Sequence, residues 1–407
     1  MTASGYILGP DRRGDCAWIV GDQWRWFGRG APPGAPKAEQ LACPDADIQP
    51  GRVNAHTHLY SGAVPYGVAM PVNPEPGLLP MLSGLWWKLD CALDHATLKS
   101  SARAAVADAL LHGTTTVFDH HESPSCIEGS LDVVANACCS LGIRALLTYG
   151  ATERNSGGEE AYAGLRECQR LCQHAPVGVV GCVGVHAGFT VRDDTLRAAG
   201  RLAVELGTVV HVHVAEDPAD VDSARERGHA GPLTRLLACE ATPPGSIVAH
   251  GIGLSQAEVA WADKSKLWLV HNPRSNAGNG LPYAQILRHA RRVALGSDGF
   301  AGPMTAEVAQ ARQLGSAFGE SPRLALHRLR AGWVLAGERL GVRLGWPTPS
   351  EPAAADVVAM RGDRAVHVLV GGRVVVRDGA LVHGTETSIR SNARAAAAAL
   401  NRAMARL

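Results

Sequence analysis

The stretch Gly51-Arg-Val-Asn-Ala-His-Thr-His-Leu-Tyr60 decides the fold, because a short apolar segment there runs into two histidines separated by one residue. Side chains of a strand alternate between its faces, so His56 and His58 point the same way and present two imidazole rings to one place. Such a pair at a strand end suits a metal ion. The chain has 17 histidines, so the pair needs partners at the ends of later strands to mean more than chance.

Seven further strand-like segments follow, and helix-like segments such as Leu98 to His112 and Asp193 to Leu206 alternate with them. After a first strand ending at His56 and His58, we expect strands at Thr114–Phe118, Ile143–Tyr149, Gly178–Val185, Thr208–Val214, Ser246–Ala249, Leu267–Val270 and Arg292–Leu295. Alternating strands and helices predict a parallel α/β sheet. Eight such units match a (β/α)8 TIM barrel, whose active sites gather at the carboxyl ends of the strands.

Both ends of the chain have a different, β-rich character. The segments are Cys16–Val20 and Trp24–Phe27 near the start, and Ala365–Val370 and Arg373–Arg377 near the end, each pair separated by turn residues. They predict hairpins. We therefore expect residues 1–50 and 350–407 to form one small composite β-sandwich, with a C-terminal helix from about Thr387, beside a barrel of residues 51–349.

The partners of the first histidine pair stand at the ends of other strands. His213 lies on the fifth strand, Glu216 follows it by three residues, and Asp298 ends the eighth strand. If the barrel closes, strands one and eight are neighbours and strand five lies across from them, so His56, His58, His213 and Asp298 should converge. Three neutral imidazoles and one carboxylate suit one divalent ion such as Zn²⁺ or Fe²⁺, with a position left for water.

A divalent ion lowers the pKa of its water and so generates hydroxide at neutral pH. In this hypothesis Asp298 ligates the metal or accepts the proton of the water, and Glu216 carries a proton to the substrate. His250, after the sixth strand, could orient the hydroxide or polarise the attacked bond. Each residue also has a structural interpretation: a packed core histidine for His250 or His211, a helix cap for Asp298 and a solvated loop for Glu216. The order of the whole set along the barrel favours the metal site.

Five motifs together carry a resemblance to a known family. They are Asn54-Ala-His-Thr-His-Leu59, His213-Val-Ala-Glu216, Ala249-His-Gly251, His271-Asn-Pro-Arg-Ser-Asn276 and Leu295-Gly-Ser-Asp-Gly299. The chain resembles the amidohydrolase superfamily, in particular its cytosine deaminase and triazine hydrolase branch, and most of all the SsnA-type aminohydrolases. The resemblance spans essentially the whole chain and is specific for the superfamily but not for a substrate.

The resemblance implies one metal ion held by His56, His58, His213 and Asp298, with Glu216 as the proton shuttle and His250 beside the hydrolytic water. It also implies that His186, after the fourth strand, contacts the substrate. Relatives with two metal ions bridge them by a modified lysine at a strand end. The fourth strand here contains no lysine, which favours a single ion, with zinc expected and ferrous iron as the alternative.

Loops after the strands should form the substrate pocket. The first, from Tyr60 to Asp90, is long and carries Tyr60, Trp86 and Trp87, which could stack on a flat heterocycle. The other candidates for substrate contact or support of the metal ligands are Arg154, Arg274, His271, Asp119, His120 and His121. Met81, Trp261 and Trp268 are expected in the core.

These residues predict a metal-dependent aminohydrolase that attacks an amino-substituted purine-like, pterin-like or pyrimidine-like ring and releases ammonia. The first alternative is a cyclic amidohydrolase or a chlorohydrolase that uses the same hydroxide. A catalytically silent ligand-binding barrel is a further alternative, although a pure binder has no need of a proton shuttle such as Glu216.

Composition limits the partners of the protein. The 39 Lys and Arg residues nearly balance 38 Asp and Glu residues, so we expect a small-molecule substrate and neither nucleic acid nor membrane as a partner. The ten cysteines form no C-x-x-C motif, and Met1–Gly5 does not resemble the start of a signal peptide. A cytoplasmic protein is expected. The resemblance is compatible with a homo-oligomer such as a dimer, but no interface can be read from the sequence.

Overall fold

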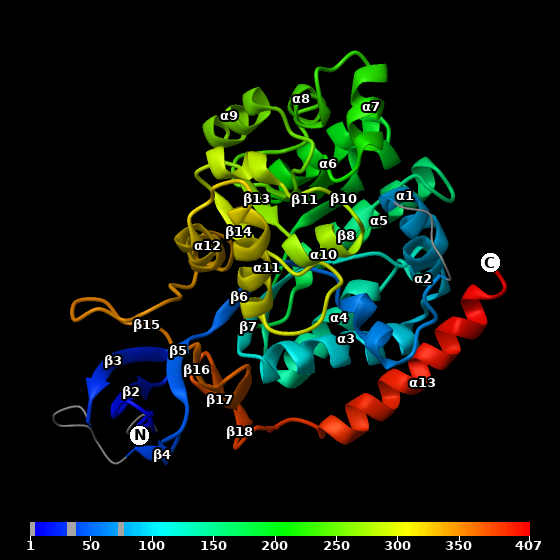
Figure 1. Cartoon of the computed structure of the whole chain (residues 1–407). Helices are drawn as coiled ribbons and strands as arrows, with labels where there is room; N and C mark the ends of the chain where they lie inside the picture. The colour runs from blue at the N-terminus through cyan, green and yellow to red at the C-terminus, as the bar shows by residue number, and fades with distance from the viewer. Residues whose placement is uncertain (1–4, 31–37, 72–76) are drawn as a thin grey trace.

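Eight parallel strands form a barrel at the centre of the computed structural model, which describes residues 5–30, 38–71 and 77–407. Their order is β14-β13-β12-β11-β10-β8-β7-β6, and a short strand, β9, pairs with β8 outside this path. The strands are β6 (Arg52–Thr57), β7 (Thr114–His121), β8 (Arg144–Ala151), β9 (Val179–Gly181), β10 (Val183–Ala187), β11 (Val210–Val214), β12 (Ile247–His250), β13 (Trp268–His271) and β14 (Val293–Leu295). The predicted TIM barrel is confirmed (Figure 1).

The barrel closes between its first and last strands. Asn54 Nδ2 donates to Ser297 Oγ at 2.7 Å, and Ser297 N–H donates to Asn54 Oδ1 at 3.0 Å. The carbonyl of His56 accepts from the amides of Ser297 and Asp298, both at 3.0 Å. A Cβ at Gly296 would lie 2.7 Å from that carbonyl oxygen, so glycine is required for this close approach. Closure therefore places Asp298 directly beside the histidines of β6.

Two strands differ in length from the prediction. The fourth is divided at Cys182, because the amide of Cys182 still donates to Leu147 on β8, whereas the next amide, of Val183, donates to Val209 beside β11. The second, β7, continues three residues beyond Phe118. Glu122 therefore follows directly on the end of β7 and lies at the mouth of the barrel.

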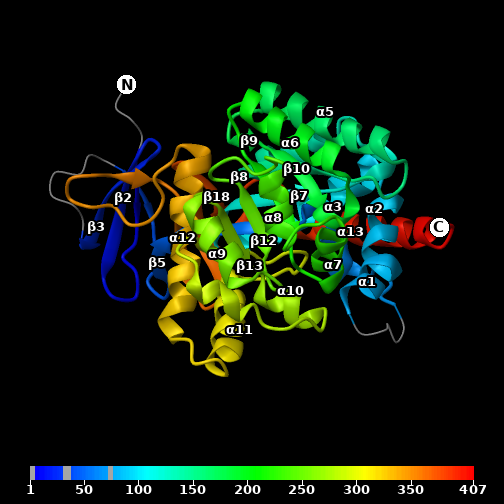
Figure 2. The ribbon, with the colours of Figure 1, turned by 90° about the horizontal axis from the view of Figure 1, so that it is seen from above.

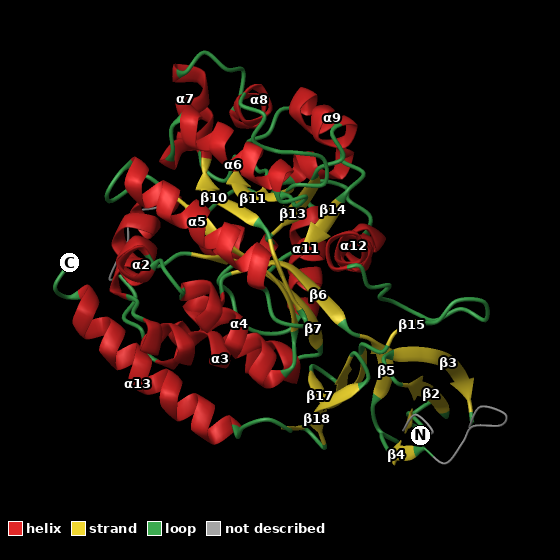
Figure 3. Cartoon of the chain, turned by 180° about the vertical axis from the view of Figure 1, so that it is seen from behind, coloured by secondary structure: helices red, strands yellow, loops and turns green. Residues whose placement is uncertain are grey.

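Helices surround the strands on the outside, as Figure 3 shows from behind. After the 3₁₀ helix η1 (Leu59–Tyr66) come α1 (Leu78–Met81), α2 (Trp87–Ala92), α3 (His95–Leu111), α4 (Ser130–Leu141), α5 (Gly158–His174), α6 (Asp193–Glu205), α7 (Pro218–Glu226), α8 (Pro232–Ala238), α9 (Gln256–Lys264), α10 (Pro273–Gly278), α11 (Met304–Ser316) and α12 (Pro322–Leu340). The predicted helices from Leu98 and from Asp193 correspond to α3 and α6. Asp94 caps α3 by accepting from the amide of Thr97 at 2.7 Å.

Two five-stranded sheets are built from both ends of the chain (Figures 1 and 2). One has the order β15-β3-β2-β1-β4, and the other has the order β19-β18-β17-β16-β5. Their strands are β1 (Gly5–Leu8), β2 (Asp15–Val20), β3 (Gln23–Arg29), β4 (Glu39–Leu41), β5 (Asp47–Pro50), β15 (Ala353–Ala354), β16 (Val357–Arg361), β17 (Arg364–Val370), β18 (Arg373–Arg377) and β19 (Ala380–Leu381). Each sheet thus contains one strand from the opposite end of the chain, and residues such as Ile19, Trp24 and Leu369 form a shared apolar core.

The C-terminal helix α13 (Glu386–Met404) runs along the barrel rather than with the two small sheets (Figure 2). Its residues Ile389, Ala393 and Leu400 belong to the same buried cluster as Leu98 of α3. Trp268 is buried as expected, but the prediction for Trp261 is wrong, because its side chain is 47% exposed on α9. None of the helices in the described ranges is long and apolar enough to span a membrane.

Candidate active site

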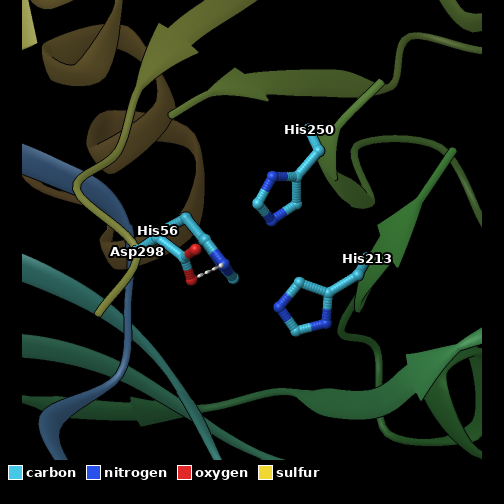
Figure 4. Close-up of side chains that lie close together, drawn as sticks. All are labelled: His56, His213, His250 and Asp298. Carbon is cyan, nitrogen blue, oxygen red and sulfur yellow. Dashed lines mark ion pairs between the residues drawn. The ribbon is translucent and has the colours of Figure 1, made fainter. Parts of the chain in front are cut away.

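Four of the predicted side chains meet at the carboxyl end of the barrel. Asp298 Oδ1 lies 2.8 Å from His58 Nε2 and 3.4 Å from His56 Nε2, and His213 Nε2 lies 3.3 Å from His58 Nε2. His250 joins them: one ligand atom each of His56, His213, His250 and Asp298 lie within 4.8 Å of one another. Figure 4 shows these four side chains pointing toward a common centre.

The hydrogen bonds of two histidines determine which nitrogen faces that centre. The Nδ1 atom of His58 lies 2.5 Å from the carbonyl oxygen of His120, and that of His213 lies 2.7 Å from the carbonyl oxygen of His186. A carbonyl oxygen only accepts, so each Nδ1 carries the proton and each neutral ring directs its Nε2 lone pair inward. The two Nε2 atoms lie 3.3 Å apart, so a cation is needed beside them. Burial acts to lower the pKa of His58, but the hydrogen bond and charge of Asp298 outweigh burial and raise that pKa to about 9, so a proton on His58 fills this place unless a metal ion does.

His56 completes the set of inward-facing nitrogens. Its Nδ1 lies 2.9 Å from His211 Nε2, and its own Nε2 is buried without a hydrogen-bond partner. An unpartnered buried nitrogen beside a carboxylate and two further imidazoles is the donor set of a divalent ion. The residues therefore fit one divalent metal ion.

A second group, His58, His120 and His213, also brings three ligand atoms within 4.8 Å. It shares His213 with the first group and His58 with the predicted set of ligands, and each of those rings has a single lone pair to give. The two groups therefore describe one ion site and not two.

Backbone strain gathers around this site. Ala215, His250 and Asp298 have φ values of 51°, 73° and 56°, a region that costs a residue other than glycine about 1–3 kcal/mol. These residues end or follow β11, β12 and β14. The unusual turns aim the side chains of Glu216, His250 and Asp298 toward the centre, and such strain is typical of functional sites.

Glu216 lies beside the cluster, with its Oε1 3.5 Å from His250 Nδ1. Burial, reinforced by the negative charges of Asp298, Asp217 and Asp220, raises the pKa of Glu216 well above its usual value. Burial also acts to raise the pKa of Asp298, but its contacts with His56 and His58 outweigh burial and hold that pKa well below the usual value. The site thus pairs one carboxyl group that holds a proton with one that stays ionised.

A cavity of about 710 Å³, including its open mouth, lies over the cluster. Its walls include Tyr60, Trp86, Trp87, His186, Phe189 and Phe300. The predicted contributions of the first loop and of His186 agree with this position, although residues 72–76 of that loop lie outside the described range. Aromatic walls around a polar floor suit a flat, partly polar ring.

Arg154 does not reach the cavity, contrary to the prediction. It is buried behind the wall, where its Nη2 lies 2.6 Å from Asp90 Oδ2 and 2.9 Å from Glu122 Oε2, and its guanidinium stacks 4.8 Å from the Trp87 ring centre. Two carboxylates share its Nη2, and its Nε donates to Thr152 Oγ1 at 3.3 Å, so Arg154 links three parts of the wall from behind the cavity. Arg274 is similarly engaged by Glu307 and the carbonyl oxygen of Ala301.

Asp119 and His271 are also placed away from the cavity. Asp119 is fully buried and accepts from the amide of Leu59 at 2.6 Å, which anchors the start of η1. His271 is fully buried, and its Nδ1 lies 3.1 Å from Arg328 Nη1. Both therefore support the scaffold, and the prediction that they contact substrate is not matched by their positions.

Two residues near the site were not assigned a role from the sequence. Glu122 lines the cavity, and it would have been found if β7 had been extended to its full length. His211 lies under the cluster and contacts His56. Its position two residues before His213 indicates that both side chains lie on the same face of β11, which could have identified it. His121 is turned away and contacts Ser123 Oγ at 2.8 Å.

Replacing Arg154 by leucine should strongly destabilise the protein. Asp90 and Glu122 would lose their buried cation, which typically costs about 3–5 kcal/mol. Urea denaturation of the metal-loaded protein would measure the free energy of unfolding. Arg197→Leu, which removes an exposed arginine paired with Asp194, is the matched control and should cost less than about 1 kcal/mol. Equal stability of the two variants would contradict the role given to Arg154.

Comparison with known proteins agrees with this geometry. The model of the amidohydrolase family matches residues 48–329. A 5′-deoxyadenosine deaminase of Methanopyrus kandleri is 27% identical over 376 residues, covering 85% of this chain and 84% of that protein. An 8-oxoguanine deaminase of Pseudomonas aeruginosa is 27% identical over 424 residues, covering 92% of each.

Solved structures share the whole fold. An adenosine deaminase from Xanthomonas campestris with bound zinc superposes with a TM-score of 0.79 at 22% identity and covers 98% of both chains. An atrazine chlorohydrolase from Arthrobacter aurescens complexed with zinc superposes with a TM-score of 0.78 at 21% identity, over 97% of this chain and 99% of the other. At these identities the likeness establishes the fold.

Proposed function

Because the chain belongs to the amidohydrolase family, we propose that it is a metal-dependent aminohydrolase that removes an amino group from a nitrogen heterocycle as ammonia. Relatives named as deaminases of 5′-deoxyadenosine and 8-oxoguanine support this class of reaction. The observation that carries the proposal is the position of Glu216 beside the histidine and aspartate cluster, in one cavity.

His56, His58, His213 and Asp298 would hold the metal ion, which we propose to be zinc, with ferrous iron as the alternative. When bound, such an ion acts as a Lewis acid and lowers the pKa of a water molecule toward neutrality. The carbonyl oxygens of His120 and His186 keep His58 and His213 in the tautomer that ligation needs. One ion per chain follows from the single lone pair of each shared ring.

Glu216 moves the proton in this proposal. Its raised pKa lets Glu216 hold a proton in the buried cavity, which it can give to the ring nitrogen as the water adds to the ring carbon. One proton of the water passes by way of Asp298 to the departing amine, and Glu216 takes back the other when the ring carbonyl forms. His250 lies within 3.5 Å of Glu216 and donates through Nδ1 to Asn276 Oδ1 at 3.0 Å. Its Nε2, which has only a long contact of 3.4 Å with Asn272 Nδ2, can then orient the water, while ionised Asp298 accepts a proton from the water.

The walls of the cavity would hold the ring. Trp86 and Phe300 both line the cavity, and His186 adds a polar side chain to its lining. Flat aromatic surfaces favour stacking with a planar heterocycle. His186 and Trp86 remain the proposed substrate contacts, whereas Arg154, His271 and Asp119 act as supports.

A chlorohydrolase is the second candidate, since one structural neighbour has that activity in its name. The protonated state of Glu216 favours the amine, because an amino group leaves only after it has received a proton, whereas chloride leaves without one. A cyclic amidohydrolase would also need the proton, so only the product separates it from a deaminase.

The test is ammonia release from a panel of aminated purines, pterins and pyrimidines by protein reconstituted with zinc or with iron. Chloride release from chlorinated analogues and ring opening are measured in the same samples, and metal-free protein serves as the control. Ammonia release that depends on metal is the expected result. Chloride release or ring opening without ammonia would sink the deaminase proposal, and binding without any turnover would favour the silent barrel.

A further inference from the structure

Glu122 is a buried carboxyl group that lines the cavity outside the metal cluster. Its Oε2 accepts from Arg154 Nη2 at 2.9 Å, whereas its Oε1 is directed toward His120 and His186. The neighbouring strand makes room for it: a Cβ at Gly150 would lie 2.4 Å from the His120 ring and 3.1 Å from Glu122 Cγ. The position of this carboxyl group is therefore closely determined.

One neighbour of Glu122 Oε1 is a hydrogen-bond acceptor. His120 Nε2 lies 3.1 Å from the carbonyl oxygen of Val185, so this nitrogen carries the proton of the neutral ring. The Nδ1 atom of His120 therefore presents a lone pair. It is buried, has no hydrogen-bond partner, and lies 3.7 Å from Glu122 Oε1.

A second neighbour, His186, is also an acceptor on the side that faces Glu122. Thr190 Oγ1 donates to the carbonyl oxygen of Ala187 at 3.0 Å, so it can only accept at its contact of 3.1 Å with His186 Nδ1. The proton of the neutral His186 ring is therefore on Nδ1. Its Nε2 presents a lone pair to the cavity, 3.6 Å from Glu122 Oε1.

An ionised Glu122 would place a third acceptor between these two lone pairs, and a neutral carboxylic acid instead supplies the missing donor. Burial raises the pKa of Glu122 to about 8; Arg154 and His58 oppose this, and Asp90 adds to it. Tyr60 faces the same region but is uncharged, since burial raises its pKa further above its usual value. Because Arg154 and Asp90 neutralise each other, this side of the cavity has no net charge.

We propose that Glu122 and His186 bind the lactam edge of the substrate, with the Glu122 O–H donating to a ring carbonyl oxygen and His186 Nε2 accepting from the adjacent ring N–H. The inference rests on the proposed function and narrows its substrate to uncharged amino heterocycles that also carry an –NH–C(=O)– edge, such as aminooxopurines. The adenine ring of an adenosine, substituted at N9, offers only lone pairs at its ring nitrogens, so apart from its amino group it lacks the N–H that His186 would accept.

Equilibrium binding separates this inference from turnover. Hypoxanthine and purine form a matched pair, because they differ only in the lactam edge and neither has an amino group to lose. Titration calorimetry on the zinc-loaded full-length protein should show hypoxanthine binding about tenfold more tightly than purine. Equal affinities would overturn the inference.

Two variants test the protonation state of Glu122. Glu122→Leu removes the donor, so the preference for hypoxanthine should disappear. Glu122→Gln keeps the shape, can accept from Arg154 and carries an N–H donor, so it should restore most of the preference. If the glutamine variant prefers hypoxanthine over purine no more than the leucine variant does, an ionised Glu122 is required for the preference. That result would overturn the inference. If the leucine variant does not fold, the glutamine variant alone decides between these two outcomes.

Turnover provides the separate test of the proposed function. Ammonia release should have a kcat/KM at least about tenfold higher with 8-oxoguanine than with 5′-deoxyadenosine. A preference for 5′-deoxyadenosine would leave the deaminase proposal standing and overturn the lactam inference. If neither compound, nor any other of the panel, releases ammonia while hypoxanthine still binds preferentially, the deaminase proposal fails and the lactam site stands.

Discussion

Glu216→Gln is expected to bind its metal ion normally and to lose about three orders of magnitude in kcat. Glutamine fills the same space beside His250 but can neither give a proton to the ring nitrogen nor take one back from the water. The variant thus removes the buried carboxyl group whose raised pKa lets it hold a proton beside His250. Metal analysis and ammonia release kinetics on the same preparation would measure both quantities.

The matched control is Glu226→Gln, which makes the same chemical change at an exposed position at the end of α7. This variant should keep both its metal and its kcat. Full turnover by Glu216→Gln would show that the proton travels by another route and would remove the main support for the proposed mechanism.

His213→Ala is expected to abolish stable metal binding. Four-ligand zinc sites bind with about 10–16 kcal/mol, so an equal share for each ligand corresponds to a loss of roughly two orders of magnitude in affinity or more. The carbonyl oxygen of His186 would also lose the donor that lies 2.7 Å away. Zinc content after dialysis against a weak chelator measures the effect, and activity should fall with it.

His289→Ala serves as the control, because His289 is an exposed histidine remote from β11 in the chain. It should retain one zinc ion per chain and full activity. If His213→Ala also kept one tightly bound ion, the assignment of His213 as a ligand would be wrong.

The sequence predicted the barrel well, because the alternation of apolar segments and helices depends on local pattern alone. It predicted the inward position of His213 for the same reason, since His211 and His213 share one face of β11 while Val210 and Val212 pack outward against the helices. The sequence did not predict on which side of the barrel wall a side chain lies when it is close to the end of a strand.

Asp119 and His271 illustrate this limit. Asp119 shares the outer face of β7 with Val117, and His271 shares the outer face of β13 with Leu269, so neither can reach the cavity. By the same alternation Glu122 shares the inner face with Phe118 and is directed inward. A strict count of alternation from an apolar residue of known face would have corrected the assignments of Asp119 and His271 and pointed to Glu122.

His250 shows what alternation cannot supply. On β12, Val248 packs outward in the helix-facing core, so a regular strand would turn His250 outward as well. Its φ of 73° turns the side chain inward instead. Such a local deviation depends on tertiary contacts, here with Asn276, and the residues of β12 alone do not encode it. The ion-pair partners of Arg154 could not be predicted from local sequence either, because Asp90 lies 64 residues away in the chain.

The hydrogen bonds between Asn54 and Ser297, 243 positions apart, have a consequence for the lifetime of the protein. The proposed ion is held by histidines of β6 and β11 and by Asp298, three residues after the end of β14, so only the closed barrel presents all of its ligands. A ligand that binds the folded state alone adds about 2.7 kcal/mol to its stability at a hundredfold excess over its dissociation constant. The bound ion would thus stabilise the closed barrel against unfolding. We therefore expect the amount of folded protein in a cell, as well as its activity, to depend on the supply of metal.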